Sequence, residues 1–226
     1  MTSLNFDDND GDDVHSNADY EEIITPEEVL RKMAGAWQNE LCAPCLLPTQ
    51  MELVDILLDQ IQGMEENIGR QADKMQLRIS LHRMELQRIS FLTSDYVRCR
   101  LQKIEANPND ALDQHKRRLE ENQSELLSET ELKFAEEYAN AEAELFEKTV
   151  FEFMPPALKK VAVPKPDHQD DMVYAKVLAD DVDNVAVPDW QDLNAEVVLE
   201  MEKTTCHLIP FQSVKVLVEE GAVQLL

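Results

Sequence analysis

The feature that most constrains the fold is an unbroken stretch from Asp73 to Glu105, which contains neither proline nor glycine. Proline and glycine are the residues that most weaken a helix interior, so the stretch is predicted to form one long helix. About 32 residues that each rise about 1.5 Å make a rod of roughly 48 Å. A compact domain of about 130 residues is only roughly 36 Å across. This helix is therefore expected to project beyond its own domain.

Two apolar stripes run along the predicted helix. The first comprises Leu77, Leu81, Met84, Leu92, Tyr96 and Cys99, and the second comprises Ile79, Leu86, Ile89, Val97 and Ile104. A helix with two apolar faces needs two packing partners. Because a projecting apolar face left in water promotes aggregation, one of these partners is expected to be another protein chain.

Two helices are predicted before the long one. Thr25 and Glu28 have the spacing of a capping box, with proline at the first helical position between them. The next helix carries apolar residues at helical spacing from Val54 to Ile68. We expect Gly69 to end that helix as a left-handed cap.

A further helix is predicted after the long one. Ser128 and Glu131 form a second capping box, which opens a helix with apolar residues from Leu132 to Phe153. The sequence Met154-Pro155-Pro156 should end it abruptly. The intervening residues from Ala111 to Glu120 form a short charged segment to which no element is assigned.

The pattern changes beyond Pro156. Short runs rich in β-branched residues predict strands at Met172–Leu178, Val185–Val187, Ala195–Met201 and Cys206–Ile209. A helical turn over Ser213–Glu220, capped by Gly221, and a final strand over Ala222–Leu226 complete the chain. We expect this apolar end to be paired into the sheet.

The chain is thus predicted to be mainly α with a small β-rich C-terminal domain. The helices between residues 25 and 156 form a helical A domain of long antiparallel helices. A proline-punctuated linker at 157–167 acts as a flexible tether for a small β-rich B domain at 168–226. Residues 1–24 carry eight acidic side chains and neither lysine nor arginine, which is typical of a disordered tail. That tail is either a solubilising segment or a docking peptide for a basic partner.

The charge of the chain limits what it can bind. A net charge of −25 disfavours nucleic acid and anionic lipid, so direct DNA binding is expected to be weak or absent. The acidic N-terminus does not resemble a targeting signal, and no apolar run is long enough to cross a membrane. Basic residues cluster only between Arg70 and Lys103, where they are expected to meet acidic surface of this chain or a partner.

Cys42 and Cys45 raise an alternative hypothesis of thiol redox or metal-binding activity. The Cys-x-x-Cys spacing suits thiol–disulfide exchange, but the pair follows a helix and has no strand before it. Cys99 and Cys206 are isolated and complete no zinc set. The usual phosphate-loop, dinucleotide and hydrolase motifs are absent from the sequence. We therefore predict no catalytic, metal-binding or cofactor-binding residues, and no enzyme activity.

Several stretches, taken together and in order, resemble the GINS replication family and, within it, its Sld-five-type subunit. They are Ile24-Thr-Pro-Glu-Glu-Val-Leu30, Ala36-Trp-Gln-Asn-Glu40, Met64-Glu-Glu-Asn67, His82-Arg-Met-Glu85, the run from Asp95 to Glu105, Leu127-Ser-Glu-Thr-Glu-Leu132, Phe153-Met-Pro-Pro156, Val163-Pro-Lys-Pro-Asp167, His207-Leu-Ile209 and the closing Gly221-Ala-Val-Gln-Leu-Leu226. The resemblance covers roughly residues 24–226.

The resemblance implies a nuclear, non-catalytic scaffold subunit that assembles with three sister subunits into a heterotetramer. That tetramer is expected to bind the MCM hexamer and a Cdc-forty-five-type factor as part of the replicative CMG helicase. An acidic helical adaptor unrelated to replication is the remaining alternative. The predicted subunit-interface residues are Met84, Leu92, Tyr96, Arg98, Arg100, Ile104, Leu132, Tyr138, Leu145, Phe146 and Phe153, and the predicted C-terminal strand contains Val223, Leu225 and Leu226.

Overall fold

A computed structural model of the chain describes residues 25–70, 77–159, 168, 171–180, 182–189 and 195–226. The predicted acidic tail and residues 160–167 of the predicted linker lie outside the described residues.

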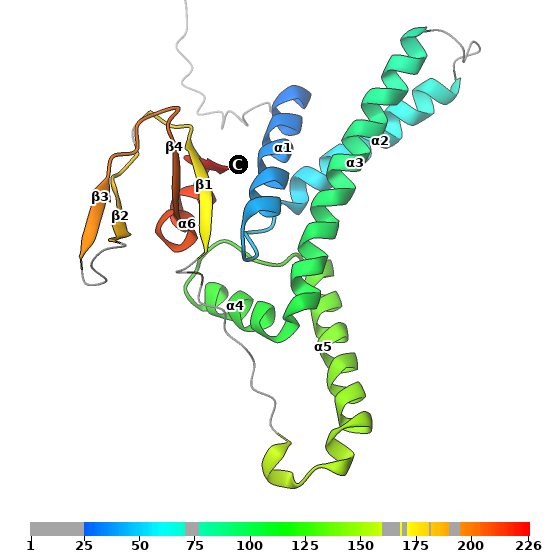
Figure 1. Cartoon of the computed structure of the whole chain (residues 1–226). Coiled ribbons are helices and arrows are strands. Elements are labelled where there is room, and N and C mark those ends of the chain that lie inside the picture. The colour runs from blue at the N-terminus through cyan, green and yellow to red at the C-terminus, as the bar shows by residue number, and fades with distance from the viewer. Residues whose placement is uncertain (1–24, 71–76, 160–167, 169–170, 181, 190–194) are drawn as a thin grey trace, which may run out of the picture.

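Within the described residues, the helical part comprises five α-helices followed by two short 3-10 turns (Figure 1). The helices are α1 (Pro26–Cys42), α2 (Met51–Arg70), α3 (Leu77–Ala106), α4 (Pro108–Glu120) and α5 (Glu129–Thr149), and the turns are η1 (Phe151–Phe153) and η2 (Pro156–Leu158). The predicted long helix is therefore present as α3, with 30 residues.

Both predicted capping boxes are confirmed. The hydroxyl of Thr25 accepts from the backbone N–H of Glu28 at 3.3 Å, and the Glu28 carboxylate accepts from the Thr25 N–H at 3.1 Å. Ser128 and Glu131 make the equivalent pair of hydrogen bonds at 3.3 and 3.0 Å. Each box satisfies donors that the first turn of a helix otherwise leaves unpaired.

The prediction that Gly69 ends α2 as a left-handed cap was wrong, because Gly69 lies within that helix and has no positive φ. Gly221, with a φ of 79°, follows α6 (Phe211–Glu219) as predicted. The charged segment Ala111–Glu120, for which the sequence predicts no element, lies in helix α4. Asn107 caps this helix by accepting from the N–H of Asp110, and Pro108 occupies its first position, where no N–H donor is needed.

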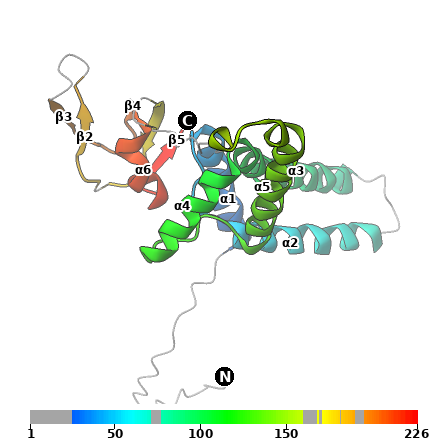
Figure 2. The same cartoon turned by 90° about the horizontal axis from the view of Figure 1, so that it is seen from below.

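Helices α2 and α3 run antiparallel and form an arm that projects from the rest of the chain, as Figure 2 shows from below. At its base, Tyr96 of α3 packs with Val29 and Met33 of α1 and with Val54 and Leu57 of α2. Toward its tip the arm has only a small core of Ile68, Ile79 and Leu86. The arm is thus well anchored at one end and thinly packed at the other.

The described residues of the C-terminal domain form five strands and helix α6. A three-stranded antiparallel sheet has the order β4-β1-β5, where β1 is Met172–Val177, β4 is Cys206–Pro210 and β5 is Val223–Leu225. Strands β2 (Val185–Pro188) and β3 (Glu196–Leu199) form a separate antiparallel pair. The register places Val173 opposite Ile209 and Ala175 opposite Leu225. Side chains of β1 alternate between the core and the surface, as a half-buried strand requires.

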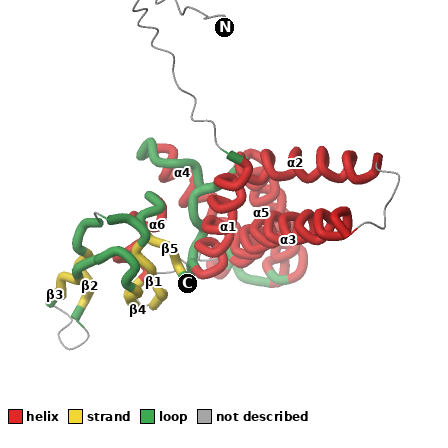
Figure 3. The backbone as a smooth tube through the Cα atoms, turned by 90° about the horizontal axis from the view of Figure 1, so that it is seen from above, coloured by secondary structure: helices red, strands yellow, loops and turns green. Residues whose placement is uncertain are grey.

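The C-terminal domain packs directly against the helical part, as Figure 3 shows for β5 and α1. Its core includes Ala43, Cys45 and Leu47 from the segment between α1 and α2, together with Phe211 and Val214 of α6. The sequence left open whether this domain is fixed or mobile on its linker, and in the structure it contacts the helical part directly. The composition of the 157–167 linker does not indicate this contact, because Cys45 and its neighbours, which enter the core of the C-terminal domain, lie between α1 and α2.

Candidate functional site

A buried ionic centre surrounds Arg100, on the inner face of α3. Its side chain has no exposed surface, and its two carboxylate partners Glu40 and Glu131 are almost as deeply buried. The guanidinium donates to both carboxylate oxygens of Glu131 at 2.7 and 2.9 Å and to Glu40 at 3.1 Å. It also donates to the carbonyl oxygens of Leu47 and Leu126, both at 2.7 Å. All five guanidinium N–H groups therefore have a partner.

Lys103, one turn further along α3, completes the centre. Its ammonium donates to Glu40 Oε1 at 2.8 Å and to the Cys45 carbonyl at 2.9 Å. The other Glu40 oxygen accepts from Arg100 and from the N–H of Leu47. Two cations thus face two carboxylates, so the buried charge is balanced within the chain. Basic residues of this helix were predicted to meet acidic surface, and Arg100 and Lys103 instead meet two buried carboxylates of the same chain.

Burial and charge set the ionisation of this centre. Burial opposes a charge on Arg100, but the hydrogen bond to Glu131 and the neighbouring carboxylates outweigh it and raise its pKa above its ordinary value. Burial also raises the pKa of Tyr96 to about 12. The Tyr96 ring lies 5.7 Å from the Arg100 guanidinium carbon, within the range of a cation–π contact. Arg100 is therefore charged and Tyr96 neutral at physiological pH.

The elements that meet here come from distant parts of the sequence. Tyr96, Arg100 and Ile104 are spaced four residues apart, so they share one face of α3 and point inward together. Glu131 is the third residue of α5, where its carboxylate both accepts from the N–H of Ser128 and binds Arg100. Glu40 lies near the end of α1. The centre joins α1, α3 and α5, and so fixes the helices whose other faces lie on the surface.

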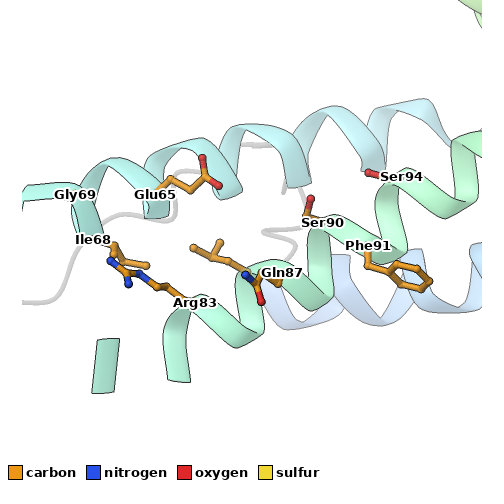
Figure 4. Close-up of a pocket in the computed structure, with 9 residues that line it drawn as sticks. Glu65, Ile68, Gly69, Arg83, Gln87, Ser90, Phe91 and Ser94 are labelled. Atoms are coloured by element: carbon orange, nitrogen blue, oxygen red, sulfur yellow. The ribbon is translucent and has the colours of Figure 1, made fainter. Parts of the chain in front are cut away.

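The arm presents a row of exposed apolar side chains and a groove. Exposed along α2 and α3 are Leu58, Met64, Leu77, Leu81, Met84 and Phe91. The groove, of about 620 Å³, lies between the two helices and is lined by Ile68 and Leu86 with Glu65 and Arg83 (Figure 4). Gly69, Ser90 and Ser94 also line it, and their small size leaves space that larger side chains would fill. An apolar side chain from another protein could enter this groove.

Helix α5 carries the second exposed apolar surface. Only Glu131 and Ala135 of this helix are buried. Exposed from there to the following turns are Tyr138, Leu145, Phe146, Phe153, Met154 and Leu158. Figure 1 shows α5 extending away from α4 and from the C-terminal domain. A helix that buries two residues within its own chain has most of its apolar face available to another one.

Burial sorts the predicted interface residues into three groups. Exposed are Met84, Arg98, Tyr138, Leu145, Phe146 and Phe153, while Leu92 and Leu132 are half-buried. Buried within this chain are Tyr96, Arg100 and Ile104, which cannot offer surface to a partner in this conformation because they form the ionic centre and the helical core. Of the residues predicted for the C-terminal strand, Val223 and Leu225 are buried in β5, and Leu226 is exposed beyond its end. For the exposed group the interface stays a prediction.

Cys42 and Cys45 lack the surroundings of reactive thiols. Burial raises the pKa of both, with the stronger burial at Cys45, whereas a nucleophilic or redox-active cysteine needs a lowered pKa. No cluster of three potential metal ligands occurs within the described residues. The same part of the chain has no helix both long and apolar enough to cross a membrane.

Comparison with known families matches both parts of the chain. Residues 53–150 match the family described as GINS complex protein helical bundle domain. Residues 167–226 match the family described as DNA replication complex GINS protein SLD5 C-terminus. The two matches cover helices α2 to α5 and the C-terminal domain.

Individual relatives agree over nearly the whole length. The DNA replication complex GINS protein SLD5 of Bos taurus is 41% identical over 217 residues, which cover 93% of this chain and 95% of that protein. The Homo sapiens protein of the same name is 40% identical, with 91% and 92% covered. The Arabidopsis thaliana protein is 30% identical, with 93% and 96% covered. This chain therefore belongs to the SLD5 family of GINS proteins.

Proposed function

We propose that this chain is a non-catalytic scaffold subunit that assembles with three sister GINS subunits into a heterotetramer. In the nucleus the tetramer binds the MCM hexamer and a Cdc-forty-five-type factor, and so becomes part of the replicative CMG helicase. The family name supports the coarser statement that the chain is a subunit of the GINS complex in DNA replication. The finer assignment of partners is our proposal.

The observation that carries the proposal is the exposed apolar surface on α3, on α5 and on the turn η1 that follows α5. Leu77 and Phe153 are 75% and 80% exposed, which is far more than large apolar side chains in a stable monomer require. The buried ionic centre joins the start of α5 to α3 and holds the two helices at fixed positions. This arrangement suits a subunit that presents preformed helix faces to other chains.

The test is assembly with and without substitutions on the exposed faces. The chain is produced together with its three sister subunits and analysed by size-exclusion chromatography with light scattering. The wild-type chain should form a complex with one copy of each subunit. Met84→Asp on the arm and Leu145→Asp on α5 should each reduce the yield of that complex at least tenfold, because each places a charge in an apolar interface.

Val216→Asp provides a matched control. Val216 and Met84 are both 64% exposed, but Val216 lies on α6 in the C-terminal domain, outside the proposed interface. The control should assemble normally. If Met84→Asp and Leu145→Asp also assemble normally, or if the chain alone is a monodisperse monomer, the proposed interface is wrong.

A further inference from the structure

A single ion pair joins α4 to the helix of the C-terminal domain. The two terminal nitrogens of Arg118 donate to the two carboxylate oxygens of Glu219 at 3.0 and 2.7 Å. The side chains are 10% and 19% exposed. A bidentate, mostly buried pair of this kind is screened less by solvent and salt than a pair on the surface. We therefore expect this pair to stabilise the contact between the helical part and the C-terminal domain more than an exposed ion pair would.

The guanidinium of Arg118 is oriented by a loop of the helical part. Its Nε donates to the Ser124 carbonyl at 3.0 Å, and one terminal nitrogen donates to the Ser124 hydroxyl at 2.9 Å. These bonds hold the fork of the guanidinium toward α6, where Glu219 lies. The arginine is thus preorganised for its partner within its own part of the chain, which lowers the entropic cost of the contact.

A second set of contacts lies between α1 and β5. The N–H of Leu225 donates to Asn39 Oδ1, and the Leu225 carbonyl accepts from Gln38 Nε2, both at 2.9 Å. Gln224 donates to Gln38 Oε1 at the same distance. Among the described residues, the helical part buries only Ala43, Cys45 and Leu47 in the core of the C-terminal domain. The contact between the helical part and the C-terminal domain, here called the joint, therefore has only a small apolar part. Hydrogen bonds and the ion pair form much of the joint.

We propose that the ion pair between Arg118 and Glu219 is a latch that holds the C-terminal domain docked on the helical part of the same chain. The latch fixes the orientation of the domain before any other protein binds. It also fixes a groove of about 810 Å³ that both parts line, with Arg31 and Lys32 from α1 and Glu220 and Gln224 from the C-terminal domain. Opening the latch lets the C-terminal domain leave α1 and removes this groove.

Amide hydrogen exchange at single-residue resolution tests the latch on the full chain. The Leu225 N–H bonds across the joint to Asn39, so it exchanges when the domain undocks. The Leu178 N–H bonds to the Ala222 carbonyl inside the domain, so it exchanges only when the domain itself opens. Glu219→Gln should accelerate exchange at Leu225 roughly tenfold, which corresponds to about 1.4 kcal/mol, and leave Leu178 unchanged.

Two further variants make the test specific. Arg118→Lys keeps the charge but loses the bidentate fork, and should accelerate Leu225 exchange by a smaller factor. Lys203→Met removes an ion pair with Asp180 that lies within the C-terminal domain, and should have no effect at Leu225. An unchanged rate at Leu225 in Glu219→Gln would overturn the latch. Equal acceleration at Leu225 and Leu178 would also overturn it, because the domain would then be unfolding and not undocking.

The result of the exchange experiment does not depend on the proposed assembly with sister subunits. The exchange measurement needs no partner, and the variants lie outside the exposed faces of α3 and α5. An unchanged exchange rate in Glu219→Gln would contradict the latch but not the scaffold proposal. Normal assembly of Met84→Asp and Leu145→Asp would contradict the proposed interface but not the latch.

Discussion

Arg100 and Glu131, 31 residues apart in the sequence, meet through two parallel hydrogen bonds of 2.7 and 2.9 Å in a site closed to solvent. Arg100 lies in α3 and Glu131 in the first turn of α5, so the pair joins the two helices that carry the exposed apolar faces. The same guanidinium also reaches Glu40 of α1. Damage to this centre should therefore affect the fold and the assembly of the protein together.

Arg100→Met should destabilise the chain by about 3–5 kcal/mol, because it leaves the Glu131 carboxylate buried without its cation. Arg100→Lys should also destabilise it, since an ammonium cannot supply five planar donors. Urea unfolding followed by circular dichroism measures both changes. Arg98→Met is the control, because the Arg98 side chain is 60% exposed and its ion pair is with Asp95, three residues earlier on the same helix. Its effect should stay below about 0.5 kcal/mol, and equal effects at both positions would contradict the role of the centre.

Tyr96 should make the protein sensitive to alkaline pH. Its pKa is raised from 10.0 in the unfolded chain to about 12 in the folded one. A raised pKa in the folded state stabilises the fold fully below about pH 10, and this contribution is lost as the pH rises toward 12. Between pH 9 and pH 11, the free energy of unfolding should therefore fall by about 1 kcal/mol more in the wild type than in Tyr96→Phe. Urea midpoints at the two pH values measure this difference, and parallel losses would exclude the tyrosine as its source.

The four cysteines should react with thiol reagents in an order set by burial. Cys206 is exposed, Cys42 and Cys99 are half-buried, and Cys45 is buried. With iodoacetamide at pH 7.5, Cys206 should be modified first and Cys45 last, as peptide mass spectrometry can follow over time. The urea-unfolded chain is the control, in which all four should react at similar rates. Rapid modification of Cys45 in the native chain would revive the hypothesis of a reactive thiol pair.

Removal of Val223 to Leu226 should unfold the C-terminal domain or block assembly. The deletion removes β5, which pairs with β1 and buries Val223 and Leu225 in the core. It also removes the contacts of Gln38 and Asn39. Loss of the exchange-protected amides of β1 would be the direct sign, measured on the truncated chain beside full-length protein. A truncated chain that keeps this protection and assembles normally would contradict the prediction.

The elements that rest on local signals could be predicted from the sequence. The capping boxes at Thr25 and Ser128 depend on residues three positions apart, and the strands of the C-terminal domain follow short alternating runs. Helix α4 was missed because its apolar content is low and its start depends on the Asn107 cap and on Pro108. The capping boxes, the strands and helix α4 all depend on interactions between residues close in the sequence, although the signal for α4 is weaker.

The ionic centre was missed because its partners are distant in the sequence. The spacing of Tyr96, Arg100 and Ile104 already places Arg100 on an apolar face, which is the signal that could have shown it pointing inward. Nothing local indicates that Glu40, 60 residues away, or Glu131 would meet it. The same holds for Arg118 and Glu219, which lie 101 residues apart. Charged residues on an amphipathic helix do not reveal their partners by spacing alone.

The contacts of Gln38 and Asn39 with Leu225 have a consequence for how strands from other proteins could bind. A sheet ordinarily exposes unpaired backbone groups at both of its edges, and an extended peptide can add to either one. At the β5 edge, the backbone N–H and carbonyl of Leu225 are already occupied by amide side chains of α1. A strand that another chain added at this edge would first have to displace Gln38 and Asn39 from Leu225.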